Sequence, residues 1–294
     1  MIKRTIEISG KENHLSVSDG SLIIRQAGTE VGRVPLEDLG LLILDAPTTT
    51  YTHSVVTEVL AAGAVIVPCG RDHHPRGLFL PQDNSLQTQR LQSQVAATLP
   101  LRKTLWKQVV QAKVRNQGSA LPEGSAAGRR LRALAGEVRS GDPANVEAQA
   151  ARLYWPAMFG KDFRRLPEGP PPNGLLNYGY MVLRASVARA VCGAGLHPSL
   201  GLHHHNRNNP FCLADDLLEP LRPLVDVRVK ALWQEGLADV QRESKVRLLA
   251  VLADTVEVEG EKGPLMVALE HVTASLVRCY AGERKKLDLP KPCN

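Results

Sequence analysis

The feature that most constrains the fold is a change of hydrophobic pattern about eighty residues into this chain of 294. Before it, short alternating or β-branched runs are separated by turn residues such as Ser18-Asp19-Gly20. After it, apolar residues recur at helical spacing and strand signals nearly vanish. We therefore predict an α+β protein. A small N-terminal β-sandwich-like domain with one helix spans 1–80, a larger all-α domain spans 81–294, and a linker lies near 76–86.

Within the first domain, the pattern also predicts individual elements. The nearly continuous apolar run at 39–45 indicates a strand buried on both sides. A helix is predicted at 52–62, with Thr49 or Thr50 as its cap. His73 and His74 sit among turn-forming residues, which favours a loop at a domain edge over a metal site. The remaining predicted strands cover 5–8, 14–17, 21–25, 30–34 and 64–69.

The charge of the chain is basic and unevenly distributed. The net charge is +6 and the pI is near 9.1. Between 100 and 140, nine basic residues are opposed by two glutamates, which gives a local charge of +7. This window predicts a surface that follows the phosphates of DNA, with Arg129, Arg130 and Arg132 as candidate contacts. A solvated helix face is the alternative.

Neither a membrane nor an oxidising compartment is indicated. No stretch has the length of a membrane-spanning helix, and the first residues lack the apolar segment of a signal peptide. The five cysteines are scattered, odd in number and without a CxxC pair. We therefore predict a cytoplasmic protein with reduced thiols.

Polar chemistry is concentrated at 201–226, where three consecutive histidines precede a short apolar pattern of helical spacing. Asp216 and Glu219 are three residues apart and share one helix face. Imidazole and carboxylate groups together suit a divalent metal. An ordinary helix with solvated acids and a histidine-rich surface loop fits the same residues.

Two prolines interrupt this helix. Pro220 and Pro223 have no backbone N–H, so a continuous helix would leave the carbonyl groups of Asp216 and Glu219 without their usual donors. The sequence therefore predicts that the helix kinks or ends here, with polar backbone exposed among the carboxylates.

A third acid lies far away in the sequence. Asp142 is a good helix cap and Pro143 fits a first helical position, which places Glu147 in the first turns of a helix. Ala150 and Ala151 are small enough to let another element approach its carboxylate. Taken alone, Glu147 is an ordinary helix glutamate.

Several segments resemble one known family. The motif HHxN followed by NPFxLADDLxEPxRPLVD occupies 203–226, and GDxxNxEAxAARxYW occupies 141–155. VPLEDLGLLILD, WKQVVQAKVRNQ and the tail GERKKLDLPKP extend the similarity over almost the whole chain. The sequence resembles the CRISPR-associated integrases, the endonuclease subunits of the spacer-acquisition module. Its NPF segment and its tail resemble the type II branch.

The resemblance implies a set of site residues. Glu147, His204 and Glu219 fall on the family's catalytic positions and would bind Mg²⁺ or Mn²⁺. His204 precedes Glu219 by fifteen residues, as in the type II pattern, although His203 and His205 leave a slip of one position open. Asp216 matches an acidic position near the metal and would support its ligands. His204 could instead act as a general acid or base.

The resemblance also implies the activity and the partners. The second domain would catalyse metal-dependent attack of a 3′-hydroxyl on a repeat phosphodiester, which inserts a new spacer into a CRISPR array in antiviral defence. The partners would be double-stranded DNA (the captured fragment and the repeat), a second copy bound through the N-terminal domain, and a small ferredoxin-like protein in a hetero-hexamer. The effector nuclease of a type II system would assist. A metal-dependent nuclease or repair protein and a non-catalytic DNA-binding scaffold are the alternatives.

Overall fold

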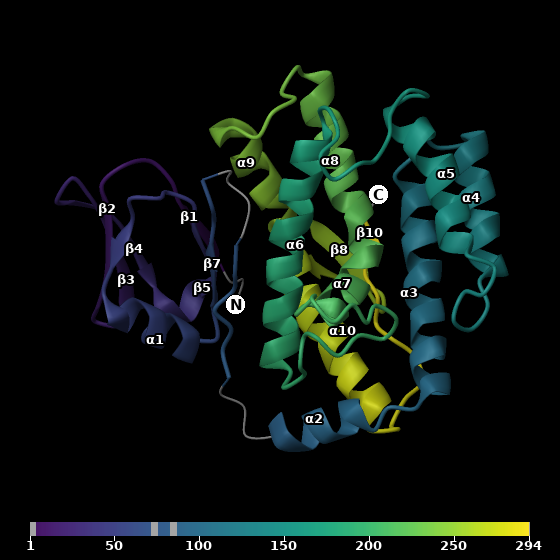
Figure 1. The fold of residues 1–294 in the computed structure, drawn as a ribbon, viewed down its shortest axis with the longest axis horizontal. Coiled ribbons are helices and arrows are strands. Elements are labelled where there is room, and N and C mark those ends of the chain that lie inside the picture. The colour runs from purple at the N-terminus through teal and green to yellow at the C-terminus, as the bar shows by residue number, and fades with distance from the viewer. Residues whose placement is uncertain (1–3, 72–75, 83–86, 294) are drawn as a thin grey trace.

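A computed structural model describes residues 4–71, 76–82 and 87–293. The strand-rich N-terminal part lies on one side of the molecule and a group of helices on the other (Figure 1). The predicted α+β fold, with a largely helical second part, is confirmed. His73, His74 and the part of the linker at 83–86 lie outside the described residues. Helix α2 (Gln87–Val95) begins directly after them, close to the predicted start near Ser85.

The N-terminal part contains two small sheets. One has the order β4-β3-β2-β6, built from β2 (Asn13–Ser18), β3 (Ser21–Gln26), β4 (Thr29–Pro35) and β6 (Thr50–Tyr51). The other is parallel, with the order β1-β5-β7, built from β1 (Arg4–Ile8), β5 (Leu39–Leu44) and β7 (Val65–Pro68). Helix α1 (His53–Ala61) has Thr52 as its cap, and not Thr49 or Thr50 as predicted, because the chain is still extended at Thr52. The short turn η1 (Leu36–Asp38) connects β4 to β5.

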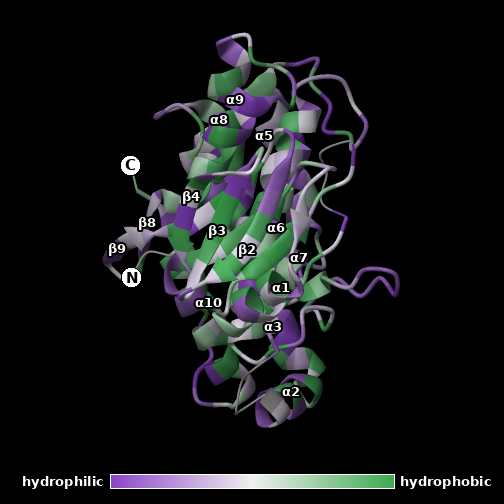
Figure 2. Ribbon diagram, turned by 90° about the vertical axis from the view of Figure 1, so that its left-hand side faces the viewer, coloured by the Kyte–Doolittle hydropathy of each residue, from purple (hydrophilic) through white to green (hydrophobic). Residues whose placement is uncertain are grey.

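Strand β5 is the centre of the parallel sheet and is buried along its whole length, which confirms the prediction for 39–45. Its two faces belong to different cores. Leu42 and Leu44 pack with α1 and the four-stranded sheet. Leu41 and Ile43 join the large core of the helical part. Figure 2 shows hydrophobic stretches along β2 and β3, with mostly hydrophilic loops at the periphery.

The second part is a bundle around α6, a helix whose residues are almost all buried. Helix α3 runs along one side of the bundle, with α4 and α5 packed on its outer face (Figure 1). No helix among the described residues is long and apolar enough to cross a membrane. The helices are α3 (Leu99–Ser119), α4 (Ala126–Glu137), α5 (Val146–Phe159), α6 (Asn173–Gly193), α7 (Cys212–Leu218), α8 (Arg222–Gln234), α9 (Arg242–Leu249) and α10 (Leu265–Tyr280), with 3₁₀ turns η2 (Glu219–Leu221) and η3 (Ala250–Ala253).

The second part is not all-α, which corrects the prediction. Strands β8 (Thr255–Val258) and β9 (Glu261–Pro264) form a hairpin, and β10 (Lys291–Pro292) completes a three-stranded sheet. The charged stretch 255–263 therefore forms ordered strands. Val256 and Val258 alternate with exposed residues and are buried, and the two turn residues Glu259 and Gly260 both have positive φ, as a tight hairpin requires.

Candidate active site

Two of the predicted site residues, Glu147 and Glu219, both pair with Lys113 of α3, a residue that was not predicted. Its Nζ lies 2.6 Å from Glu147 Oε1 and 2.5 Å from Glu219 Oε2. The side chain of Lys113 is 12% exposed and that of Glu219 6%, so this pair is sheltered from water, whereas the side chain of Glu147 is 28% exposed. Two acids 72 positions apart in sequence are thus held on one cation.

Glu147 reaches this point from the first turn of α5. The helix begins at Val146, and its cap is Asn145, whose side chain accepts a hydrogen bond from the backbone of Ala148. Asp142 is not the cap residue as predicted, because the chain turns once more before the helix. Its carboxylate still accepts the backbone N–H groups of Val146 and Glu147 at 2.9 and 3.0 Å. These contacts fix the end of α5 from which the Glu147 side chain projects.

Glu219 is the most deeply buried of the three predicted ligands, with 5% of its surface exposed. It makes a second ion pair with Arg222, whose Nε donates to Oε1 at 2.9 Å. Burial alone would raise the pKa of Glu219, but Lys113 and Arg222 outweigh it and hold that pKa at about 2. Oε2 is a buried oxygen with no hydrogen bond, and its close partner is the Lys113 ammonium.

The prolines end the helix where the sequence predicted. Helix α7 stops at Leu218, the turn η2 carries Glu219 and Pro220, and α8 begins at Arg222. The freed backbone is not exposed, however, which corrects that expectation. Asn116 Nδ2 donates to the carbonyl of Pro220 at 2.7 Å, and the N–H of Glu219 donates to the carbonyl of Asp216. The 3₁₀ turn points Glu219 at α3 instead of continuing the helical face.

His204 is held by Asp216. Its Nδ1 lies 2.6 Å from Oδ1 of this fully buried carboxylate. Asp216 also accepts the backbone N–H groups of Leu202, His203 and His204 at 2.6, 3.0 and 3.2 Å. The hydrogen bond to Asp216 raises the pKa of His204; burial opposes this, and the charges of Asp216, Glu219 and Glu147 add to the increase.

The neighbouring histidines are engaged differently. The ring of His203 stacks on Trp106 of α3, with centroids 4.4 Å apart and an interplanar angle of 3°. His205 Nδ1 contacts the backbone carbonyl of His203 at 2.8 Å. The charges of both glutamates act on His204 and raise its pKa. Asp215, the other acid near Glu219 in sequence, pairs with Arg184 at 2.7 Å instead.

These residues fit a hard divalent cation in part. The described residues contain no group of three or more His, Cys, Asp or Glu side chains already arranged around a metal. Two carboxylates nevertheless converge on a single positive charge, and the buried Oε2 of Glu219 has no donor of good geometry. A histidine whose Nδ1–H donates to a carboxylate keeps Nε2 available, the usual arrangement of a metal-binding imidazole. Carboxylate and imidazole ligands suit Mg²⁺ or Mn²⁺.

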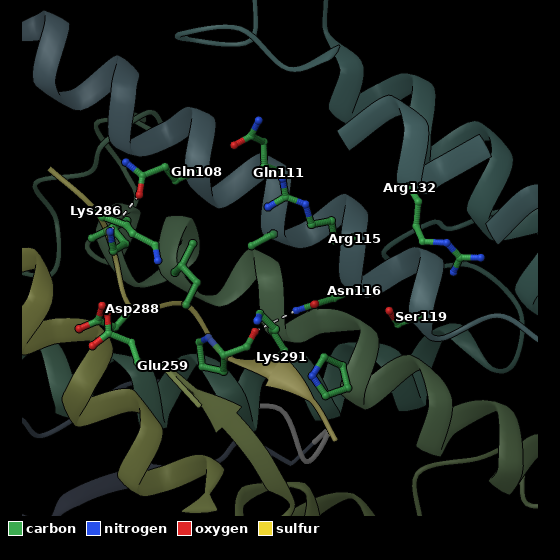
Figure 3. A pocket seen from close by; sticks show the side chains of 15 residues that line it. Gln108, Gln111, Arg115, Asn116, Ser119, Arg132, Glu259, Lys286, Asp288 and Lys291 are labelled. Carbon is green, nitrogen blue, oxygen red and sulfur yellow. Dashed lines mark hydrogen bonds between the residues drawn. The ribbon is translucent and has the colours of Figure 1, made fainter. Parts of the chain in front are cut away.

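The three arginines predicted to contact DNA lie on α4 and differ in their partners. Arg130 is exposed and pairs with Glu137 at 3.0 Å, and Arg129 donates to the backbone of Gly124. Arg132 lines a groove of about 600 Å³ between α3, α4 and the C-terminal tail. Figure 3 shows the groove and its other cations, which are Arg115, Lys286 and Lys291.

Lys113 and Arg222 belong to this site but were not among the predicted site residues. Lys113 was one of nine basic residues in the 100–140 window, and nothing local distinguished it from the solvated ones. Its spacing from Trp106 is seven residues, which places both on the same side of α3. That relationship, combined with the buried tryptophan, is the signal that could have found it.

A carboxylate pair on one cation and a carboxylate-bound histidine provide the ligand types that metal-dependent phosphodiester enzymes use. The family model for "CRISPR associated protein Cas1" matches residues 6–252. The chain is 38% identical over 283 residues to the CRISPR-associated endonuclease Cas1 of Neisseria meningitidis serogroup C, covering 94% of this chain and 92% of that one. The chain therefore belongs to the Cas1 family.

Solved structures agree on the fold. The casposase bound to integration product matches with a TM-score of 0.80 at 18% identity, covering 99% of this chain and 94% of that one. The Cas1-containing chain of a Cas6-RT-Cas1–Cas2 complex matches with a TM-score of 0.77 at 17% identity, covering 99% of this chain and 36% of that one. The predictions of an enzyme, and of the CRISPR spacer-integrating endonuclease class, are confirmed by the family.

Proposed function

We propose that Glu147, His204 and Glu219 form the catalytic metal site of this integrase, with Mg²⁺ or Mn²⁺ as the ion and Asp216 as the residue that orients His204. The observation that carries the proposal is the Lys113 ammonium, which lies 2.6 and 2.5 Å from the two glutamates where positive charge is needed. In this proposal Lys113 balances the two acids in the metal-free protein.

When bound, the ion would polarise a phosphodiester oxygen and lower the pKa of the attacking hydroxyl. The chain's own residues prepare the site. Glu219 stays ionised at neutral pH because its pKa is held at about 2. Asp216 fixes the imidazole of His204 through Nδ1 and so directs Nε2 away from itself. In strand transfer, the 3′-hydroxyl of the captured fragment forms the new P–O bond, the 3′-oxygen of the repeat leaves, and one proton passes between them.

Strand transfer and Mn²⁺ binding, measured separately, test the triad. Joining of a short duplex to a repeat-bearing plasmid should be abolished by Glu147→Ala, Glu219→Ala and His204→Ala, and reduced less by Asp216→Ala. Both glutamate variants should also lose Mn²⁺ affinity. Joining by Glu147→Ala at the wild-type rate and saturating Mn²⁺ would remove that residue from the site.

His204 has two possible tasks, which the same experiment separates. Loss of joining together with weaker Mn²⁺ binding in His204→Ala identifies a metal ligand. Loss of joining with unchanged Mn²⁺ affinity identifies a general acid or base.

We propose further that DNA runs over the basic surface of α3 and α4. Of the three predicted arginines on α4, Arg132 is the best candidate for a DNA contact, because it lines the same groove as three other cations, Arg115, Lys286 and Lys291. Arg132→Ala should weaken duplex binding and lower the salt slope by about one, whereas Arg130→Ala is the matched control on the same helix. Equal slopes for both variants and the wild type would place the DNA elsewhere.

The finer assignments are also proposals. A type II origin rests on the NPF segment at 209–211 and the C-terminal tail. Assembly with a Cas2-type partner as a hetero-hexamer is supported by the complex that shares this fold. We propose that residues 1–80 mediate homodimerisation, that residues 81–294 carry catalysis, and that a type II effector nuclease assists.

Five free cysteines suit a reducing, cytoplasmic setting. Light scattering of the protein with and without its partner tests the assembly.

A further inference from the structure

A second cavity, lined by three arginines, lies apart from the candidate active site. Its volume is about 470 Å³, and it opens where the end of α6 meets α2 and α10, in the lower part of Figure 1. Gly63, in the turn between α1 and β7, adds a wall from the N-terminal part. None of the residues proposed for metal binding lines it.

A buried arginine, Arg189, supplies a positive charge at the wall of this cavity. Arg189 of α6 is 8% exposed, and its Nη2 donates to Glu270 Oε1 at 2.9 Å. Its Nη1 is buried and has no hydrogen-bond partner among the described residues. Burial lowers the pKa of the guanidinium, and Glu270 opposes that change in part. A buried charged donor without an acceptor is costly, so native structures usually satisfy such a group with a protein atom, a water or a ligand.

The cavity as a whole is cationic. Arg90 and Arg278 line it together with Arg189, whereas Glu270 is its one carboxylate among the described residues, and that side chain is 57% exposed. The end of α6 contributes carbonyl oxygens that would repel an anion, but Arg90 Nη1 already donates to one of them, Ala194 O, at 2.9 Å. Arg278 makes a long contact of 3.4 Å to Asp288.

We propose that this cavity is a phosphate-binding site, in which the guanidinium groups of Arg189 and Arg278 hold the phosphate oxygens. Planar guanidinium groups bind phosphate oxygens in pairs, and three of them around one small cavity match a doubly charged anion better than a carboxylate. The phosphate belongs either to a DNA backbone or to a small free anion. The volume admits a single phosphate group with a short attached moiety.

Calorimetric titration of the full-length protein with inorganic phosphate, in chloride buffer of matched ionic strength, tests the site. The wild type should bind phosphate, and Arg278→Ala and Arg189→Lys should each weaken binding by about tenfold or more. Glu270→Gln should tighten it, because it removes the carboxylate that competes for Arg189. Arg33→Ala is the matched control, since Arg33 is an exposed arginine paired with Glu30 in the other part of the molecule.

The source of the phosphate is decided with a duplex of about 30 base pairs as the second probe. Competition between duplex and phosphate, lost in Arg278→Ala, identifies a DNA phosphate. Unchanged duplex affinity in Arg278→Ala identifies a small free anion. Absence of phosphate binding by the wild type, or equal binding by wild type and Arg278→Ala, overturns the proposal. Because Arg278 is half exposed, its variant remains informative even if Arg189→Lys fails to fold.

Discussion

Glu219 and Asp226 lie seven residues apart, are both buried, and have opposite electrostatic environments. Glu219 faces Lys113 and Arg222, which together hold its pKa at about 2 despite burial. Asp226 faces the hydroxyl groups of Tyr154 and Tyr180, which donate to its two oxygens. There burial dominates, although the hydroxyls oppose it, and the pKa of Asp226 rises to about 6.

The difference separates a site built to hold positive charge from a structural hydrogen-bond cluster. A carboxylate that stays ionised beside a displaceable cation can exchange that cation for a metal. In Asp226, by contrast, each carboxylate oxygen accepts a hydrogen bond from a neutral donor, the hydroxyl of a buried tyrosine. Burial of an acid is therefore not sufficient to identify a catalytic carboxylate here.

The largest expected effect is the difference in strand-transfer rate between variants of Glu219 and variants of Asp226. Glu219→Ala should lower the rate of strand transfer by about a thousandfold or more, because a lost metal ligand removes several kcal/mol of transition-state stabilisation. Asp226→Asn, which keeps the size of the side chain, should stay within about tenfold of the wild type. Rates of joining at saturating Mn²⁺ check this, and equal losses in the two variants would erase the distinction.

Replacement of Lys113 tests the comparison between Glu219 and Asp226 by removing the cation that faces Glu219. Lys113→Met should destabilise the metal-free protein by about 3 kcal/mol, because two carboxylates then lose their shared partner. Added Mn²⁺ should recover more of the melting temperature in this variant than in the wild type. Lys103→Met, an exposed lysine on the same helix, is the control. A Mn²⁺ effect of equal size in all three proteins would show that Lys113 does not occupy the ion's place.

The pH dependence of stability tests the Asp226 environment. Its pKa is about 6 when folded and near 3.8 when unfolded, so the folded state binds the extra proton between these values. The free energy of unfolding should therefore lose about 3 kcal/mol from this group as pH rises from about 4 to about 6. Asp226→Asn should lack that loss. Urea unfolding at several pH values measures the difference, which a constant gap between the proteins would contradict.

The smallest expected effect comes from the tyrosines. Tyr154→Phe removes the 2.9 Å hydrogen bond to Asp226 Oδ2 and leaves Tyr180 in place. It should destabilise the protein at neutral pH by about 1 kcal/mol and shift the pH transition of Asp226 upwards, since one donor to the ionised form is lost. A downward shift of that transition would be inconsistent with the hydroxyl acting as a donor.

Much of the fold could be predicted because its signals are local. The doubly buried strand, the helix interrupted at Pro220 and the switch from strands to helices each depend on a few neighbouring residues. The hairpin at 255–264 was missed because its charged residues concealed a short alternation of two valines. The tail strand β10 is two residues long and owes its pairing to β8, so no local pattern could reveal it.

The site was only partly predictable, because most of its contacts join residues that are far apart in the sequence. Glu147, His204 and Glu219 came from a resemblance, because residue types alone gave Glu147 no distinction. Lys113 was not predicted at all, since its neighbours in space, Glu147 and Glu219, are 34 and 106 residues away in sequence. The hydrogen bond between His204 and Asp216 joins residues only twelve positions apart, yet the sequence pattern alone did not specify it either.

Strand β5 limits how this protein can be divided. A cut at the boundary between strands and helices would leave Leu41, Ile43, Val65 and Val67 facing water, and would strip the helical part of the sheet on which it packs. Neither fragment would then be an autonomous folding unit, and calorimetry of the intact chain should give a single cooperative transition. Exchange of N-terminal parts between relatives would succeed only when the residues of this shared sheet face are exchanged with their helical neighbours.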